Sequence, residues 1–396
     1  MGVTAMEEIV VIDGARTAIG TFGGSLSETS ASELGAHVIR EAVQRSGVSP
    51  TLVDQVILGC VGQVAEDGYI ARHASVKAGM PVETPAYTVN RLCGSGLEAI
   101  NTAARWLQTG DANIVVAGGT ENMSMMPYLL RKGRTGYGYG HAEVEDSTMH
   151  MLTDPFEKIL MGETAENLAE KYEISRTIQD EYALRSQERA KVAVESGYFK
   201  DQISPIEVRK GRDTFTFETD EHPRATSIDK LANLRPVFRE NGSVTAGNSS
   251  GINDGAAAVV LTTSTQAQTL GLTPRMRMVA RAESGVDPSI MGQGPIPAIE
   301  NVMTKANLSI SDMDVIELNE AFASVAATCS TVLDLPKDKT NPNGGAIALG
   351  HPIGATGAIL TIKAMAELER TNGKYALVSL CIGGGQGIAT IFERID

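Results

Sequence analysis

Hydrophobic positions along the chain follow two patterns, one typical of helices and the other typical of buried strands. Helical stripes, in which apolar residues recur every three or four positions, occur at residues 39–43 and 299–306. Short uninterrupted apolar runs occur at residues 114–117 and 376–378. Runs without alternation are typical of parallel strands that helices cover on both faces. The chain is therefore predicted to have an α/β fold.

The same order of elements occurs twice. The stretch from Ile39 to Cys60 and the stretch from Ile299 to Glu320 both lead from a helical stripe, through a serine and an aspartate, into a strand-like segment. In a second correspondence, a Gly-rich turn opens a helix that ends before a buried strand; these turns lie at residues 94–96 and 354–357. We therefore expect two pseudo-symmetric halves packed into one body.

The chain is too long for a single core, because hydrophobic cores stop growing at roughly 250–300 residues. Between the two copies lie a Gly-Tyr-Gly-Tyr-Gly run, charged helical stretches and proline-containing loops. We predict an N-terminal half at residues 1–122, an inserted loop domain at 123–243 and a C-terminal half at 271–396. Residues 244–270 return to glycine and small apolar residues and are expected to rejoin the first half.

The net charge limits the classes of partner. The 396 residues include 34 Lys and Arg against 48 Asp and Glu, which gives −14 at pH 7. Such an acidic chain does not attract nucleic acid or an anionic membrane nonspecifically. No window approaches the roughly 20 apolar residues of a membrane span, and a predicted strand at 9–12 follows the start without a signal segment. We expect a soluble, cytoplasmic protein with no nucleic-acid or membrane partner.

The cysteines point away from metal binding. Cys60, Cys93, Cys329 and Cys381 lie far apart and form no Cys-x-x-Cys pair, so neither a zinc site nor a disulfide framework is indicated. Free thiols in a reducing compartment are expected. The starting interpretation of each cysteine is a small buried hydrophobic residue.

Cys93 is the cysteine whose surroundings best suit a nucleophile. It directly precedes Gly94-Ser-Gly96 and a helix expected to begin near Leu97. Unpaired N–H groups and the positive end of the helix dipole stabilise a thiolate there and would lower the pKa of the thiol. The glycines let a substrate carbonyl approach backbone donors. An unreactive buried cysteine is the alternative interpretation.

Three other side chains are expected near Cys93. His351 lies in a turn-rich run that corresponds to the Cys93 region of the first half, so it is a candidate base, although single histidines are usually structural. Cys381 follows the strand-like residues 376–380 and enters a Gly-rich loop, which alternatively only needs positive φ at its glycines. Asn319 ends another strand and offers a polar group, or alternatively caps the next helix.

Four segments together resemble the signature blocks of the thiolase family and stand in the family's order and spacing. They are Val89-Asn-Arg-Leu-Cys-Gly-Ser-Gly96, Asn319-Glu-Ala-Phe322, Gly350-His-Pro-Ile-Gly354 and Cys381-Ile-Gly-Gly-Gly-Gln-Gly387. The likeness covers essentially the whole chain. It implies the five-layered αβαβα thiolase fold and an acyltransferase with coenzyme A as co-substrate, without a tightly bound cofactor or metal.

The resemblance also implies a role for each site residue. His351 would deprotonate Cys93, which takes an acyl group from one CoA thioester, and Cys381 would remove an α-proton from acetyl-CoA. One oxyanion hole would use His351 and a water held by Asn319, and the other the backbone N–H groups of Cys93 and Gly383. The implied reaction is a reversible ping-pong condensation of two acetyl-CoA to acetoacetyl-CoA plus CoA, or thiolytic cleavage of 3-ketoacyl-CoA as in fatty acid metabolism.

By the same resemblance, seven residues would lie along the pantetheine and nucleotide of coenzyme A. They are Leu152, Met161, Arg224, Phe238, Ala246, Ser250 and Met291. The spacing around Arg224 is shorter than in the family. A homotetramer built from two dimers is also implied, with the loop near residues 130–140 as its candidate contact.

One position departs from the family pattern. Many acetoacetyl-CoA thiolases have His-Met-Gly before a Thr-Ala-Glu-Asn block, whereas this chain has Leu160-Met161-Gly162. The departure removes a polar contact on the substrate side. A longer or differently placed acyl group is the resulting hypothesis.

Four other functional classes compete with this interpretation. Residues 94–99 fit a dinucleotide fingerprint, but the lead-in is a poor strand and no acidic residue follows at the expected distance. Residues 247–251 fit Gly-x-Ser-x-Gly of a serine hydrolase, but a strand-like stretch follows where a helix is required. A ketoacyl synthase shares the doubled fold but commonly pairs its cysteine with His/His or His/Asn, which Cys381 disfavours. A non-catalytic acyl-CoA binding protein is the remaining class.

Overall fold

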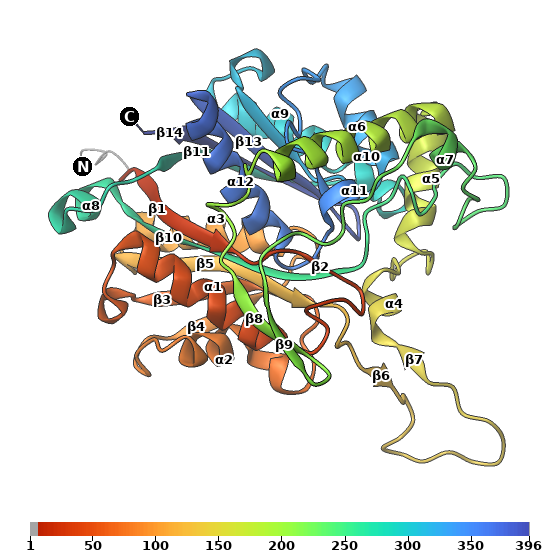
Figure 1. Ribbon diagram of the computed structural model, residues 1–396, viewed down its shortest axis with the longest axis horizontal. Helices are drawn as coiled ribbons and strands as arrows, with labels where there is room; N and C mark the ends of the chain where they lie inside the picture. The colour runs from red at the N-terminus through yellow and green to blue at the C-terminus, as the bar shows by residue number, and fades with distance from the viewer. Residues whose placement is uncertain (1–6, 396) are drawn as a thin grey trace.

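A computed structural model describes residues 7–395, and its first half is built around a mixed sheet (Figure 1). The strand order is β4 (Ala86–Val89), β3 (Gln55–Gly59), β5 (Ile114–Asn122), β10 (Asn253–Thr263) and β1 (Ile9–Arg16), and β2 (Gly20–Thr21) pairs with β10. Strand β3 runs parallel to β4 and β5, whereas β10 is antiparallel to β5 and to β1. Strand β10 thus joins the sheet from a position far along the chain.

The second half repeats this sheet. Its order is β12 (Val315–Leu318), β13 (Tyr375–Ile382), β14 (Gln386–Arg394) and β11 (Met276–Gly285), with a parallel first pair and antiparallel later pairs. A single bridge between Ile316 and Thr340 stands where β4 stands in the first half. The sheets meet edge to edge at β1 and β11 through two residue pairs, Val10 with Arg277 and Val11 with Met276.

Helices complete the layers. Helices α3 (Ser95–Thr109) and α12 (Thr356–Thr371) pack on each other and contact strands of both sheets, so they form the central layer. The first sheet carries α1 (Ala31–Ser46) and α2 (Ile70–Lys77) on its outer side, and the second carries α9 (Pro295–Ala306) with α10 (Ala323–Val332) beside it. The predicted five-layered αβαβα arrangement is confirmed.

Glycines let the two central helices touch at the level of the backbone. A Cβ added at Gly96 would lie 2.9 Å from the Gly354 carbonyl oxygen, and one added at Gly357 would lie 2.3 Å from the Leu97 backbone nitrogen. Contacts that short are not tolerated between a side chain and a backbone, so only glycine fits. The starts of α3 and α12 are therefore held closer together than any other residue type would allow.

The remaining elements lie mostly between residues 123 and 243 and extend over both halves. These elements are β6 (Tyr128–Leu129), β7 (Glu145–Asp146), α4 (Ser147–Met151), α5 (Met161–Lys171), α6 (Arg176–Glu195), β8 (Ile206–Lys210), β9 (Asp213–Phe217) and α7 (Ile228–Ala232). Helices α5 and α6 pack against α10 of the second half. In contrast, the backbone of Arg16 in β1 exchanges hydrogen bonds with Gln202 and Ser204, which attaches the following segment to the first half.

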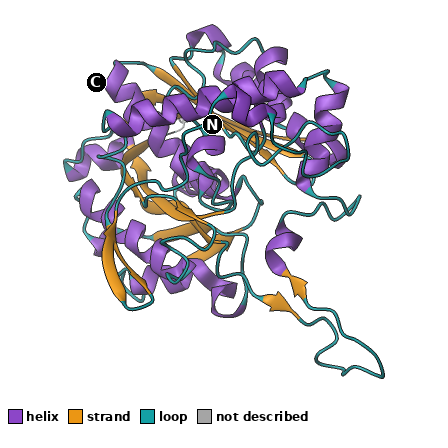
Figure 2. Cartoon of the chain, turned by 45° about the vertical axis from the view of Figure 1, so that its right-hand side comes forward, coloured by secondary structure: helices purple, strands orange, loops and turns teal. Residues whose placement is uncertain are grey.

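A two-stranded ribbon, β6 with β7, projects away from the body (Figure 2). We refer to residues 124–146 as the arm. Its exposed large apolar side chains are Met125, Tyr128, Leu130, Tyr137, Tyr139 and Val144. Side chains of this kind mark contact surfaces when they gather on one element.

Short elements connect the layers, and two large clusters of buried apolar side chains fill the spaces between the layers. The short elements are η1 (Pro50–Leu52), η2 (Ala65–Tyr69), α8 (Ser264–Leu270), η3 (Pro288–Gln293), η4 (Ile310–Asp312) and α11 (Ala346–Leu349). One cluster joins the first sheet, α1, α3 and α12 to one face of the second sheet, and the other joins the opposite face of the second sheet to α9, α10 and α5. Among residues 7–395, no helix has the length and apolarity that crossing a membrane requires.

Candidate active site

The side chain of Ser95 holds the turn that contains Cys93. Ser95 accepts a hydrogen bond from the Arg91 backbone N–H at 2.9 Å and donates one to the Leu92 carbonyl at 2.6 Å. Leu92 has φ +45°, which costs a residue with a Cβ about 1–2 kcal/mol. Backbone strain held by surrounding bonds is typical of functional turns. The turn places Cys93 just before α3, where the residue as a whole is partly exposed but protein atoms enclose its thiol.

The sulfur of Cys93 faces the start of the loop after β13. The backbone N–H of Gly383 donates a hydrogen bond to it. Burial nevertheless raises the pKa of the Cys93 thiol to about 11, since the Gly383 and Cys93 N–H groups lower it by less and the charge of Glu121 raises it further. The expectation of a lowered pKa is therefore wrong for the free protein, because desolvation outweighs the helix terminus.

His351 is buried, and its hydrogen bonds define which ring nitrogen carries the proton. The Thr356 hydroxyl donates to the Pro352 carbonyl at 2.9 Å, so its oxygen accepts the bond from His351 Nδ1 at 2.7 Å. Nδ1 therefore carries the hydrogen, and Nε2 keeps its lone pair. Burial lowers the pKa of His351 to about 4. The imidazole is neutral at physiological pH and can accept a proton at Nε2.

Asn319 lies beside that lone pair. Its Nδ2 is 3.5 Å from His351 Nε2, and its Oδ1 finds no hydrogen-bond partner among the described residues although it is fully buried. A buried amide oxygen of this kind is suited to hold a water or a substrate group. The alternative role as a helix cap is wrong, because α10 begins at Ala323 with Phe322 as its cap.

Cys381 is fully buried near the end of β13. Burial raises the pKa of its thiol well above the ordinary value, and neighbouring Cys93 and Cys329 raise it further. Gly94, the residue after Cys93, lies against Ile382, the residue after Cys381. A Cβ on Gly94 would lie 2.5 Å from the Ile382 side chain. The Cys93 turn thus packs directly on the strand that carries Cys381. Both thiols and the imidazole are uncharged at rest.

A cavity of about 350 Å³ opens beside His351, and its walls are mainly apolar. Five of the residues expected along coenzyme A line it: Leu152, Met161, Phe238, Ala246 and Ser250. Leu160 also lines it. Cys93 and Cys381 are not among the lining residues, but Met161 connects the cavity to their loop, because its methyl carbon lies 2.7 Å from where a Cβ of Gly383 would be.

The other two expected CoA residues lie elsewhere. Arg224 lines an adjoining cavity of about 200 Å³ together with Lys230, and this cavity shares Ala246 with the first. Met291 is 3% exposed and belongs to the apolar cluster of the second half, so it lines neither cavity. The continuous lining therefore leads from His351 past Ala246 to Arg224.

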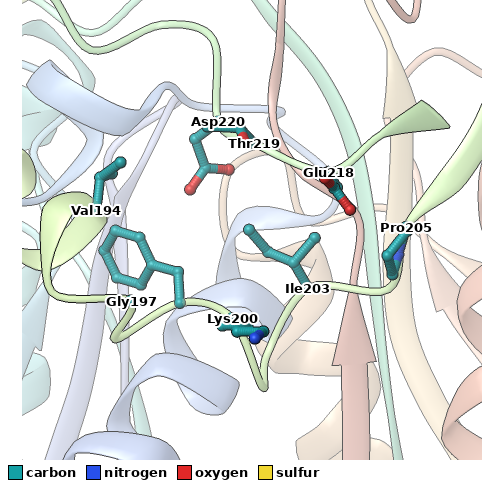
Figure 3. A pocket seen from close by; sticks show the side chains of 9 residues that line it. Val194, Gly197, Lys200, Ile203, Pro205, Glu218, Thr219 and Asp220 are labelled. Carbon is teal, nitrogen blue, oxygen red and sulfur yellow. The ribbon is translucent and has the colours of Figure 1, made fainter. Parts of the chain in front are cut away.

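A separate cavity of about 380 Å³ lies between the end of α6 and the segment that follows it (Figure 3). Asp220 lies at its wall, where its carboxylate accepts two hydrogen bonds from the Arg16 guanidinium at 2.8 and 2.9 Å and one from the Ile19 N–H. Lys200 and Glu218 also line it. Since Asp220 is fully engaged, this cavity is a packing seam without a free buried polar group.

Two further sequence hypotheses can be compared with the structure. Ser249, the serine of the hydrolase-like pattern, donates to the Thr245 carbonyl at 2.7 Å, and strand β10 follows it instead of a helix. The hydrolase alternative therefore lacks its turn. Within residues 7–395, no group of three or more His, Cys, Asp or Glu side chains could hold a metal ion.

Three positioning residues were missed by the sequence analysis. Thr356 supports the imidazole, Asn253 Oδ1 accepts the His351 backbone N–H at 2.9 Å, and Glu121 accepts the Gly354 N–H at 2.8 Å. The available signals were a threonine in the Gly354-Ala-Thr-Gly357 turn, five residues from His351, and polar residues at the ends of the buried strands β5 and β10. The partners of Asn253 and Glu121 lie far away in the sequence, which hides these two pairings.

Comparison with known proteins covers both halves. The family model described as the thiolase N-terminal domain matches residues 9–265, and that of the thiolase C-terminal domain matches residues 272–394. The beta-ketothiolase BktB of Cupriavidus necator is 53% identical over 98% of this chain and 99% of that protein. The human mitochondrial 3-ketoacyl-CoA thiolase is 46% identical over 97% of this chain and 98% of its own length.

Two solved structures are similar to this chain over nearly its whole length. The acetyl-CoA acetyltransferase of Bacillus anthracis superposes with a TM-score of 0.97 at 47% identity, covering 99% of this chain and all of that one. The human mitochondrial 3-ketoacyl-CoA thiolase in complex with CoA superposes with a TM-score of 0.94 at 45% identity, covering 98% of each chain. Fold, site and sequence therefore lead to one conclusion: this chain belongs to the thiolase family.

Proposed function

We propose that this protein catalyses the reversible condensation of two acetyl-CoA to acetoacetyl-CoA plus CoA, and the thiolytic cleavage of 3-ketoacyl-CoA, by a ping-pong mechanism through an acyl-cysteine. The observation that carries the proposal is the neutral His351, which keeps a lone pair on Nε2 and lines an apolar cavity, while the half to which it belongs packs on the Cys93 turn. The names of the relatives, which include acetyl-CoA acetyltransferases and 3-ketoacyl-CoA thiolases, support the same reaction class.

Proton transfer follows from the charges of the resting site. Because the pKa of Cys93 is about 11 and that of His351 about 4, the free protein holds a thiol and a neutral imidazole. His351 Nε2 takes and keeps the Cys93 proton as the sulfur attacks the thioester carbonyl, and the Cys381 thiol gives its proton to the departing CoA sulfur, so that CoA leaves as the thiol. The Cys381 thiolate then takes an α-proton from the second acetyl-CoA, the carbanion attacks the carbonyl of the acyl-cysteine, and the departing Cys93 sulfur takes its proton back from His351.

Two oxyanion sites stabilise the charge that develops. The backbone N–H of Gly383, which donates to the Cys93 sulfur, and that of Cys93 itself face the carbonyl of the acyl-cysteine. Asn319, with its unpartnered Oδ1, holds a water that acts with His351 on the thioester oxygen of the second acetyl-CoA. Each donor of this kind contributes about 3 kcal/mol.

Coenzyme A follows the joined cavities away from His351. The pantetheine lies against the apolar wall formed by Leu152, Met161 and Phe238, and Ser250 offers a hydroxyl there. The nucleotide extends past Ala246, where Arg224 and Lys230 supply positive charge for its phosphates. A role for Met291 remains a prediction from the sequence alone.

The acyl-cysteine gives the direct test of this function. Incubating the full chain with acetyl-CoA is expected to add about 42 mass units to the peptide that contains Cys93, the size of one acetyl group. Cys93→Ala should show no added mass and no CoA-dependent loss of acetoacetyl-CoA. An unmodified Cys93 peptide in the wild type, measured by mass spectrometry, would identify a non-catalytic binding protein instead.

Thr356 tests the tautomer of His351. Thr356→Val removes the acceptor for Nδ1–H, so the proton can move to Nε2 and the base is lost. We expect kcat to fall roughly 10- to 100-fold, part of the 10²–10⁴ that general-base catalysis contributes. Thr356→Ser keeps the oxygen and should retain most of the activity in the same steady-state assay. Equal kcat for the valine and serine variants would contradict this role.

Leu160 tests the range of acyl groups. Its side chain lines the cavity, so Leu160→His introduces a polar group on the substrate side. We expect the ratio of kcat/KM for acetoacetyl-CoA over 3-ketohexanoyl-CoA to rise roughly 10-fold, the usual size of an effect from one changed pocket contact. Leu160→Met, which keeps the wall apolar, is the control. An unchanged ratio in the histidine variant removes the hypothesis.

We also propose a cytoplasmic homotetramer, a dimer of dimers joined through the arm. Support comes from the exposed aromatic side chains of the arm, such as Tyr128, Tyr137 and Tyr139. Replacing residues 131–144 by a short Gly-Ser linker should convert tetramers into dimers in sedimentation velocity. A tetramer that survives this change would exclude the arm as its contact, and cell fractionation checks the location.

A further inference from the structure

Glu121, near the end of β5, is a buried carboxylate to which the catalytic scheme gives no task. Its side chain is 1% exposed and accepts hydrogen bonds from three backbone N–H groups. These come from Val61 at 3.0 Å, from Gly62 at 2.8 Å and from Gly354 at 2.8 Å. The Cys60 thiol donates a fourth, long contact at 3.5 Å. Both carboxylate oxygens are thus engaged by main-chain groups from two distant segments.

The Gly354 bond crosses from one half of the protein to the other. Gly354 ends the short loop that begins at His351 and leads into α12. Its carbonyl oxygen lies against the first half as well, since a Cβ on Gly119 would come within 2.0 Å of it. A Cβ on Gly354 itself would lie 2.7 Å from the Glu121 carboxylate. The loop is therefore pressed onto the end of β5 with no space for adjustment.

The two ends of this loop are held by different side chains of the first half. Asn253, at the start of β10, accepts the His351 N–H, while Glu121, in β5, accepts the Gly354 N–H. Between these bonds lies the one buried histidine that faces the cavity. Since a displacement of about 1 Å at a reacting group can cost 10²-fold in rate, both bonds bear on the chemistry.

We propose that Glu121 is a positioning residue, which fixes the His351 loop of the second half against the Cys93 turn of the first half. It acts through the Gly354 bond and does not touch substrate. The proposal rests on the proposed roles of Cys93 and His351.

The charge of Glu121 supplies an independent readout. It raises the pKa of Cys93, so the same group that places the base also favours the protonated thiol between turnovers. The other titratable groups near Glu121 and Cys93 are Cys60, Cys381 and His351. Arg91, which lies just before the Cys93 turn, has its charge paired with Glu98 at 3.4 Å. A residue with only a structural function would not change the thiolate fraction of Cys93.

Two substitutions separate the effect of the length of the Glu121 side chain from the effect of its charge. Glu121→Asp keeps the negative charge but shortens the side chain by one methylene, so the carboxylate withdraws from Gly354. Glu121→Gln keeps the length but removes the charge, and its one remaining oxygen can accept either from Gly62 or from Val61 and Gly354, but not from all three N–H groups. The matched control is Glu166→Gln, since Glu166 is equally buried and accepts the Ser243 and Val244 N–H groups at 2.8 Å without touching the His351 loop.

The experiment measures kcat/KM for thiolysis of acetoacetyl-CoA and the rate of Cys93 alkylation by iodoacetamide against pH. Glu121→Asp should lose about 10²-fold in kcat/KM, because it loses the Gly354 bond. Only Glu121→Gln should shift the alkylation profile to lower pH, because removing a nearby negative charge favours the thiolate. Glu166→Gln should lower the urea midpoint of unfolding and leave the alkylation profile unchanged.

Two results would overturn the proposal. One is wild-type kcat/KM in Glu121→Asp, which decides the matter even where the glutamine variant does not fold. The other is a loss in Glu121→Gln that equals that of Glu166→Gln, with an unshifted alkylation profile. Failure of the proposed function is distinguishable, because it would leave Cys93 of the wild type without an acetyl group.

Discussion

The backbone contact between the starts of α3 and α12 is the constraint on which the rest of the structure depends. Gly96 and Gly357 remove the side chains that would separate these helices, and the two Gly-rich turns before them carry Cys93 and His351. Each half contributes one turn, so neither half contains a site of its own. The doubled fold therefore has a direct chemical purpose, which is to bring two helix starts into one place.

Burial gives this site its electrostatic character. A dry environment disfavours every charged form, and it does so for the thiol of Cys93, the thiol of Cys381 and the imidazole of His351 alike. The resulting site stores no ion pair. These three groups become charged only when a thioester arrives, at points where the Gly383 and Cys93 N–H groups and Asn319 are already oriented. The bound substrate, and not a resident charge, initiates proton transfer.

Much of this arrangement could be predicted from the sequence, because repeated patterns and short motifs are local. The two pairs of repeated stretches indicated the doubled α/β fold, and the Gly-rich turns indicated where Cys93, His351 and Cys381 would lie. Quantities that depend on three-dimensional surroundings could not be predicted. The direction of the Cys93 pKa shift depends on burial, and the clamping of the His351 loop by Glu121 joins residues with no pattern in common. Met291 shows the same limit, because its neighbours in space bury it in the core.

The sparse edge between β1 and β11, only two residue pairs long, has a consequence for how the chain reaches its native state. The two sheets are held together mainly by α3 and α12, which lie far apart in the sequence and are therefore synthesised at different times. Contacts between residues so distant in sequence form slowly. Until the C-terminal portion emerges, the inner apolar face of the first sheet is covered by α3 but lacks α12, and the exposed remainder favours aggregation. Enzymatic turnover therefore reports that nearly the whole chain has been made and folded, since Cys381 lies close to the C-terminus and far along the chain from Cys93.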